Sequence, residues 1–223
     1  AEFDRQKIKA LKNYADLNQW GTYAIPLLFN FAKTGKLIRG TILLETYSLL
    51  GSQKNYPLSL ACALELIHSG LLIHDDIMDQ DFLRRGEKTI PALLQDEVSN
   101  LHTANSIAIC AGDIAFFIAQ ELSCEYGARV NQFLSSEIVK VGMGQMQDVY
   151  PKGEISKESI ISTYRFKTGR YTFSLPLCLG AILSGVDEKI TQKLDEIGEI
   201  MGIIYQIEDD YLGIFGIDIG KEI

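Results

Sequence analysis

Cysteine, histidine, proline and tryptophan are all scarce in this chain of 223 residues, with four, three, five and one copies respectively. The cysteines stand singly in apolar stretches, without a CxxC or Cys/His spacing, which argues against a structural zinc site and a disulfide framework. We therefore expect reduced core thiols in a cytoplasmic protein, at Cys62, Cys110, Cys124 and Cys178.

Long apolar runs and a positive charge excess are also missing. No uninterrupted apolar run approaches about 18 residues, so no stable membrane anchor is expected. The charged N-terminal stretch AEFDRQKIKALKNY lacks the apolar block of a signal peptide. A net charge of −8 argues against a nucleic-acid partner. The 47% of hydrophobic residues suffices for one sizeable core or two smaller ones.

Strand-type alternation is hard to find, whereas helical spacing recurs along the whole chain. One apolar stripe steps by three or four residues through Ile190, Leu194, Ile197, Met201, Ile204, Ile207 and Tyr211. Asp187 is a predicted N-cap for that helix, and Pro57, Pro91 and Ser156 mark further helix starts. With no linker, repeat or low-complexity segment, the chain is predicted to be one all-α domain over residues 1–223.

The stretch HDDIMDQDFLRRG, residues 74–86, concentrates four aspartates beside an apolar run. On a helix Asp75 and Asp79 lie one turn apart on the same face, and Asp76 lies about 100° round. Stacked carboxylates repel unless a cation offsets them, and Mg²⁺ is typically held by one or two carboxylates plus substrate phosphates. The alternative is a solvated acidic face, which the apolar helix leading into the motif disfavours.

A second acidic stretch, YQIEDDYLGIFG, covers residues 205–216. It sets Asp209 and Asp210 at the end of another apolar helix, with Tyr205 and Gln206 on the polar stripe of Asp209. Two acidic helix ends that face each other would hold several Mg²⁺ ions around one diphosphate.

Basic residues that suit a polyanion accompany the acids. Lys36 and Arg39 fall at a predicted helix start, where free N–H groups also favour an anion. His68 is two turns before Asp75 on the same face. Each has an ordinary alternative as a surface or core residue, but together they predict an apolar helical bundle around a central cavity that handles diphosphates with apolar tails. The other residues of this predicted diphosphate-binding set are Arg84, Arg85, Lys167 and Thr168.

The ordered motifs resemble the trans-isoprenyl diphosphate synthases, the polyprenyl synthetase family. GKLIRG, ELIHSGLLIHDDIMDQDFLRRG, GQMQD, KTGRYTF and YQIEDDYLG follow one another over nearly the whole chain. The resemblance implies the all-α isoprenoid synthase fold and a Mg²⁺-dependent condensation of isopentenyl diphosphate with an allylic diphosphate. It also implies a homodimer.

The residue roles implied by the resemblance fall into four groups. Asp75 and Asp79, with Asp76 supporting, would bind Mg²⁺, and Asp209 would hold a further ion with Asp148 and Gln206 close by. The allylic diphosphate would contact Arg84, Lys167 and Lys221. Isopentenyl diphosphate would be held by Lys36, Arg39, His68 and Arg85. The path of the reacting carbons would be lined by Thr168 and Gln206.

Product length would be set below the first aspartates, at Leu71, Gly70, Ser69 and Ile67. Bulky aromatic residues four or five positions before the first aspartate shorten the product in this family. Gly70 is expected to leave room, which favours a product beyond geranylgeranyl, of about six isoprene units. Side chains of residues 139–143 are an alternative floor, with geranylgeranyl diphosphate as the alternative product.

Two features depart from the family pattern. Gly213 stands where a fifth-position aspartate is usual, and FGIDIGKEI ends the sequence where the family continues with further helices. These features leave a non-catalytic partner subunit as an alternative, although the first aspartates are intact. A terpene cyclase would not need the isopentenyl-binding residues, and a plain helical scaffold would need neither cluster.

Overall fold

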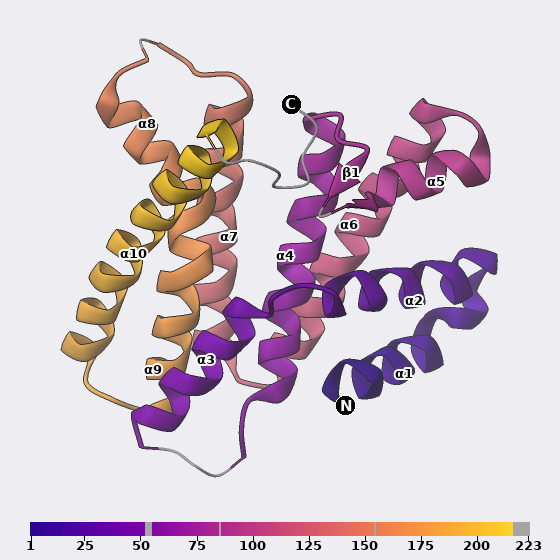
Figure 1. Cartoon of the computed structure of the whole chain (residues 1–223). Coiled ribbons are helices and arrows are strands. Elements are labelled where there is room, and N and C mark those ends of the chain that lie inside the picture. The colour runs from indigo at the N-terminus through magenta and orange to yellow at the C-terminus, as the bar shows by residue number, and fades with distance from the viewer. Residues whose placement is uncertain (52–54, 85, 154, 216–223) are drawn as a thin grey trace. The chain divides into compact units, whose positions relative to one another are not determined.

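The computed structural model describes residues 1–51, 55–84, 86–153 and 155–215 (Figure 1). In chain order the elements are α1 (Glu2–Tyr14), the 3₁₀ turn η1 (Ala15–Leu17), α2 (Gln19–Lys33), α3 (Ile38–Leu49), α4 (Leu58–Met78), β1 (Leu83–Arg84), β2 (Glu87–Lys88), α5 (Ile90–Val98), α6 (Leu101–Cys124), α7 (Ala128–Val149), α8 (Lys157–Thr163), the π-helix η2 (Tyr164–Ser174), α9 (Leu175–Ser184) and α10 (Glu188–Phe215).

The all-α prediction is confirmed, because the strands of the described residues form only a short antiparallel hairpin. Leu83 pairs with Lys88 and Arg84 with Glu87, around Gly86 at a positive φ of 79°. The described residues divide into two compact units, formed by residues 1–37 with 62–122 and by residues 38–61 with 123–215. The single domain and the central cavity stay predictions.

The predicted helix starts are confirmed by their caps. α4 begins directly after Pro57, whose carbonyl accepts from Ala61 N (3.0 Å), and Pro91 lies in the first turn of α5. Ser156 caps α8 in a reciprocal pair with Ser159 (3.1 and 2.9 Å). Asp187 Oδ1 accepts from Lys189 N (2.8 Å) at the start of α10. Side-chain acceptors satisfy N–H groups that a helix start otherwise leaves unpaired.

The first unit packs around a stripe of small residues on α6. Leu28, Ile73, Ile90 and Leu94 are buried against alanines that recur every three or four residues on one face of α6. Small side chains at that spacing let α4 approach α6 closely. The alanines are Ala104, Ala108, Ala111 and Ala115.

In the second unit η2 contacts both α7 and α10, and glycines allow the close approach. A Cβ on Gly144 of α7 would lie 2.5 Å from Lys167 N, and one on Gly202 of α10 would lie 2.0 Å from Gly169 Cα. Backbone therefore meets backbone on both sides of η2.

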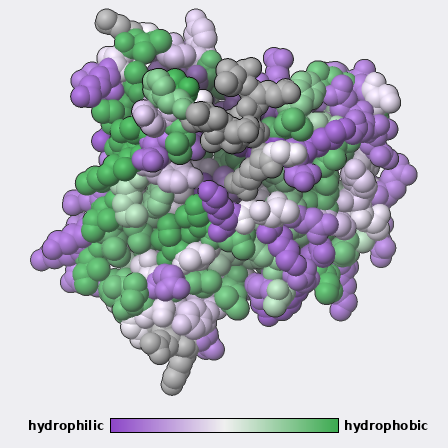
Figure 2. Space-filling model, viewed as in Figure 1, coloured by the Kyte–Doolittle hydropathy of each residue, from purple (hydrophilic) through white to green (hydrophobic). Residues whose placement is uncertain are grey.

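The predicted apolar stripe is helical, as expected, but all of its side chains except the half-buried Leu194 are exposed on α10. The buried residues of α10 are instead the small Thr191, Gly198 and Gly202, and the two glycines let the helix lie against η2. Figure 2 shows apolar side chains in green on the left of the view, where Figure 1 draws α10.

The four cysteines are free, in line with the absence of a disulfide framework. Only two are core thiols: burial raises the pKa of Cys62 and of Cys178 to about 12. Cys110 and Cys124 are exposed, which corrects the expectation for these two. They lie on the outer face of α6 and at its end.

Two helices, α4 and α6, have the length and composition to cross a membrane, although polar residues interrupt both. Buried residues make up 67% of the apolar window of α4, as in the core helix of a folded domain. The absence of a membrane anchor stays a prediction.

Candidate functional site

The first aspartates lie at the end of α4 in the first unit. Asp79 follows the last helical residue, yet its N–H still donates to Asp75 O (2.8 Å), so the helical turn continues and the two residues lie one turn apart on the same face. Asp75 is half-buried and Asp79 exposed. The predicted one-turn spacing of Asp75 and Asp79 is therefore present at the C-terminal end of an apolar helix.

Arg84 binds the aspartate that lies behind this pair. Its Nε donates to Asp76 Oδ1 (2.7 Å) and its Nη2 lies 2.6 Å from the same oxygen, while Asp75 and Asp81 lie 3.7 and 3.9 Å from Nη2. Burial raises the pKa of Asp76 to about 6, with Arg84 acting in the opposite direction. Arg84 is thus an ion-pair partner of the aspartates in this structure.

The hairpin holds Arg84 in this place. Thr89 Oγ1 donates to Asp81 O (2.8 Å) and Thr89 N to Phe82 O (3.0 Å), which ties β2 back to the end of α4. The neighbouring Arg85 lies outside the described residues.

The room expected at Gly70 is absent. A Cβ there would lie 2.8 Å from a ring carbon of Phe116 and 2.9 Å from Gly112 O, both on α6. At about 100° per residue, Gly70 lies about 140° round α4 from Asp75, whereas Leu71 lies about 40° from it. The glycine serves helix packing, and the expectation of open space at this position is wrong.

The other residues of α4 divide between core and site face. Ser69 is buried and donates to Glu65 O (2.8 Å), and Ile67 is buried in the core. His68 and Leu71 are half-buried on the Asp75 face. Among the four product-length candidates, Leu71 has the best orientation toward that face.

The second acidic motif lies on α10 in the second unit, and its contacts differ from expectation. Gln206 Nε2 donates to Asp210 Oδ1 (2.7 Å), four residues on, and the hydroxyl of Tyr164 donates to Asp210 as well. This hydrogen bond raises the pKa of Tyr164 to about 12. Asp209 is exposed, so its carboxylate faces solvent.

Sequence reasoning assigned no role to Tyr164 and included Asp210 only as a member of the second acidic motif. The i, i+4 spacing of Gln206 and Asp210 was a signal for their contact. No sequence feature near Tyr164 indicates that its partner is Asp210, which is 46 residues away.

Lys167 and Asp148 come together as a pair, with Nζ and Oδ2 2.6 Å apart. Asp148 is at the end of α7, and Lys167 is on the π-helix η2. π-Helical turns are often found near functional sites. Thr168, the next residue of η2, is half-buried. Two of the predicted site residues are thus adjacent in the second unit.

Arg39 is a buried cation near the start of α3. Its Nη2 donates to Thr172 Oγ1 (2.7 Å), its guanidinium carbon lies 4.3 Å from the centre of the Tyr171 ring, and its Nε is buried without a hydrogen-bond partner. Lys36 is exposed just before α3, as the predicted helix start requires. Lys221 lies outside the described residues.

The acidic residues suit a metal that arrives with its substrate. In the described parts of the chain, no three His, Cys, Asp or Glu side chains form a ready metal cage. The first cluster nevertheless sets Asp75 and Asp79 one helical turn apart on one face, and the buried Asp76 Oδ2 has no hydrogen-bond partner. Mg²⁺ is commonly bound by one or two carboxylates, water and substrate phosphates, so these residues fit it.

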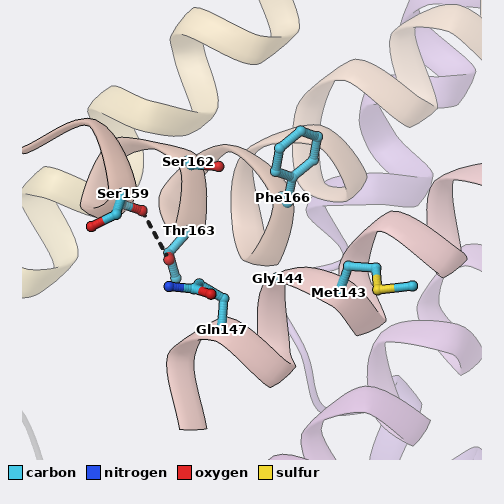
Figure 3. A pocket seen from close by; sticks show the side chains of 7 residues that line it. All are labelled: Met143, Gly144, Gln147, Ser159, Ser162, Thr163 and Phe166. Carbon is cyan, nitrogen blue, oxygen red and sulfur yellow. Dashed lines mark hydrogen bonds between the residues drawn. The ribbon is translucent and has the colours of Figure 1, made fainter. Parts of the chain in front are cut away.

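A pocket of about 350 Å³ is lined in part by Gln147 and Phe166, the residues that directly precede Asp148 and Lys167 in the chain (Figure 3). Figure 3 shows its upper wall formed by hydroxyl side chains and Phe166, and its lower wall by α7. Its lining includes Met143, the last residue of the alternative floor at 139–143, but none of the proposed metal- or diphosphate-binding residues, and Thr163 Oγ1 donates to Ser159 O (3.1 Å) within it. The lining residues are Met143, Gly144, Gln147, Ser159, Ser162, Thr163 and Phe166.

Comparisons with known proteins give a consistent result. A sequence model of the family described as "Polyprenyl synthetase" matches residues 22–223. Geranylgeranyl diphosphate synthase of Saccharolobus solfataricus is 32% identical over 196 residues, covering 83% of this chain and 56% of the relative. Farnesyl diphosphate synthase of Geobacillus stearothermophilus is 32% identical over 213 residues, covering 88% and 68%.

A solved structure is also similar. Geranylgeranyl pyrophosphate synthase from Corynebacterium glutamicum, complexed with isoprenyl diphosphate and magnesium, matches with a TM-score of 0.87 at 30% identity. The match covers 97% of this chain and 67% of that one. The chain thus spans little more than half the length of the first relative named and about two thirds of the others.

Proposed function

The chain belongs to the polyprenyl synthetase family, and on that basis we propose that it is a prenyltransferase. It joins isopentenyl diphosphate to an allylic diphosphate and makes a linear trans-polyprenyl diphosphate. The observation that carries the proposal is the one-turn spacing of Asp75 and Asp79 at the end of an apolar helix, with the Asp76–Arg84 pair beside it. The two synthases named above, and the structure complexed with isoprenyl diphosphate and magnesium, support the same reaction.

The carboxylates are proposed to hold the metal. Asp75 and Asp79, supported by Asp76, bind Mg²⁺ together with the allylic diphosphate, and Asp209 with Asp148 binds a further ion. When bound, Mg²⁺ supplies positive charge that stabilises the leaving diphosphate.

Arg84 and Lys167 are proposed to bind the allylic diphosphate. Each is paired with an aspartate in the described structure, Arg84 with Asp76 and Lys167 with Asp148. A substrate phosphate replaces a carboxylate as the partner of each base, so neither cation has to be stripped of its counter-charge. Lys221 is proposed to add a contact.

Isopentenyl diphosphate is proposed to bind Lys36, Arg39, His68 and Arg85. The contacts of Arg39 with Thr172 and Tyr171 restrict its guanidinium before the anion arrives, which lowers the entropy cost of binding. Its buried Nε has no hydrogen-bond partner, so a polar ligand or water would satisfy that donor.

The bond changes need no enzymic nucleophile. The allylic C–O bond breaks, its electron pair leaves with the diphosphate, and a delocalised allylic cation remains. The double bond of isopentenyl diphosphate attacks this cation, and a proton is then lost to the released diphosphate. Thr168 and Gln206 are proposed to line the path of the reacting carbons, where apolar surroundings exclude water.

Product length is the finer part of the proposal. The hexaprenyl length relied on open space at Gly70, and the Phe116 ring removes that support. This favours the geranylgeranyl alternative as the product. Leu71, on the Asp75 face of α4, is the proposed contact for the growing tail. A homodimer, a cytoplasmic location and the absence of a membrane anchor remain part of the proposal.

The test is direct. The purified protein is incubated with labelled isopentenyl diphosphate, Mg²⁺ and either farnesyl or geranylgeranyl diphosphate, and the dephosphorylated products are separated by chain length. We expect Mg²⁺-dependent elongation, and chelation with EDTA should abolish it.

Matched variants separate site from surface. Asp75→Ala should abolish turnover, whereas Asp96→Ala, an exposed aspartate paired with Lys88 at 2.5 Å, should retain it. Elongation that persists in Asp75→Ala would refute the metal assignment. No elongation by the native protein, with diphosphate binding intact, would favour the non-catalytic subunit.

A further inference from the structure

Arg170 on η2 anchors a cluster of charged side chains that the proposed reaction does not use. On α7, its Nε donates to Glu137 Oε2 (2.8 Å) and its Nη2 to Glu137 Oε1 (3.1 Å). On α10, its Nη1 donates to Glu199 Oε2 (2.9 Å) and its Nη2 to Asp195 Oδ1 (2.9 Å). One guanidinium therefore joins three carboxylates from the two helices that contact η2.

The centre of the cluster is buried, so its hydrogen bonds require a defined geometry. Glu137 is 1% exposed and Arg170 is 8% exposed. Burial opposes the charge of Arg170, but its hydrogen bonds and charge interactions with Glu137 and Asp195 outweigh burial and raise its pKa. A planar guanidinium suits such a fork of carboxylates, which a lysine cannot reproduce.

Polar contacts tie η2 to its neighbours at two levels. Glu137 precedes Asp148 on α7 by eleven residues, and Glu199 precedes Asp210 on α10 by the same number. Eleven residues are close to three turns, so each pair shares a helix face about 16 Å apart. Arg170 makes the contacts at Glu137 and Glu199, which we call the lower level; Asp148 and Asp210 mark the upper level.

The upper contacts come from the same stretch of η2. Lys167 reaches Asp148 at 2.6 Å, and Tyr164 donates to Asp210. In Figure 1, η2 is the orange helix between α8 and α9. Lys167 and Asp148 are residues that the proposed reaction engages, whereas Arg170, Glu137 and Glu199 are not.

We propose that Arg170 is a positioning residue: its contacts with three carboxylates set the register of η2 between α7 and α10, and so hold Lys167 and Thr168 level with Asp148 and Gln206. The inference rests on the proposed function. Close backbone approach at Gly202 keeps η2 against α10, and the Arg170 cluster adds directional contacts that oppose sliding or rotation.

The test compares a charge-balanced double variant with a matched control. Arg170→Met with Glu137→Gln removes one charge of each sign, so the fully buried Glu137 is not left as an unpaired carboxylate. Asp195 loses Arg170 but is partly exposed, and Glu199 keeps its ion pair with Arg165.

The control is Arg129→Met, which breaks another ion pair between α7 and α10, with Glu188 at 2.6 Å, but an exposed one. Each protein is assayed for kcat and KM well below its unfolding temperature, and for hydrogen exchange of the peptide spanning residues 164–174.

The expected result is a fall of about 10- to 100-fold in kcat/KM for the allylic diphosphate in the double variant, because small displacements of a positioned group are costly. Exchange in residues 164–174 should be about tenfold faster or more. Arg170→Lys, which keeps a point charge, should fall between native protein and double variant, and it replaces the double variant if the latter does not fold. Arg129→Met should match the native protein in both measurements.

Other outcomes decide against the proposal. A folded double variant with native kcat/KM overturns the positioning role, whatever its exchange. A lower Tm with unchanged kcat/KM and exchange means that the cluster only stabilises the fold. If the native protein shows no turnover, the proposed function fails, and exchange alone then tests the register: unchanged exchange in residues 164–174 overturns that too.

Discussion

The contact between Gly144 and η2 leads to a sharp prediction from two neighbouring glycines of α7. A Cβ on Gly144 would lie 2.5 Å from Lys167 N and 2.8 Å from Phe166 C, whereas one on Gly142 would have nothing within 4 Å. Gly144→Ala and Gly142→Ala therefore make the same chemical change on the same helix, with and without a steric clash.

The magnitudes follow from two opposing effects. Alanine gains about 1 kcal/mol over glycine in a helix interior, which both variants share. Non-bonded atoms prefer separations of about 3.5 Å or more, so Gly144→Ala must move α7 and η2 apart by about 1 Å. Overpacking of this kind costs about 1–3 kcal/mol. The free energy of unfolding should thus differ by about 2 kcal/mol between the variants, with Gly142→Ala the more stable.

Thermal unfolding and turnover measure the two consequences. A difference of 2 kcal/mol corresponds to about 4–8 °C in Tm for a chain of this size. Turnover should fall up to about 100-fold in Gly144→Ala alone, because Lys167 is displaced from Asp148. Equal Tm values and equal turnover in the two variants would refute the close approach of α7 to η2.

The remaining predictions concern other parts of the molecule. Gly70→Ala should lower the free energy of unfolding by about 1 kcal/mol, because the contact of its Cβ with the Phe116 ring costs about 1–3 kcal/mol and alanine regains about 1 kcal/mol within α4; an unchanged Tm would mean that the ring moves aside freely. Arg84→Met should cost about 3–5 kcal/mol, since it leaves the buried Asp76 carboxylate without its partner; denaturant unfolding measures this, and Arg129→Met should cost less than about 1 kcal/mol. A thiol reagent at pH 8 should modify two cysteines quickly and two only on unfolding, since burial and a pKa of about 12 keep the latter as thiols; four fast thiols would contradict this. The fast pair is Cys110 and Cys124, and the slow pair is Cys62 and Cys178.

The helices and the acidic motifs were readable from neighbouring residues. Caps such as Ser156 and Asp187, and the one-turn spacing of Asp75 and Asp79, depend on atoms only two to four residues apart. Periodicity likewise predicted α10, but its apolar stripe did not predict which face is buried, because the close contact with η2 uses Gly202 and other small residues.

The amino-acid order was sufficient for the all-α class and for the position of the two acidic motifs at helix ends, and it supplied the residues that we propose to bind a diphosphate. It did not predict that Phe116 fills the space at Gly70, that Arg170 joins three carboxylates, or that Arg39 bonds Thr172 across 133 residues. Helix caps and spacings are local interactions, so short stretches of sequence specify them. Partner choice among buried charges and aromatic rings depends on which helices come together, and only the tertiary structure decides that.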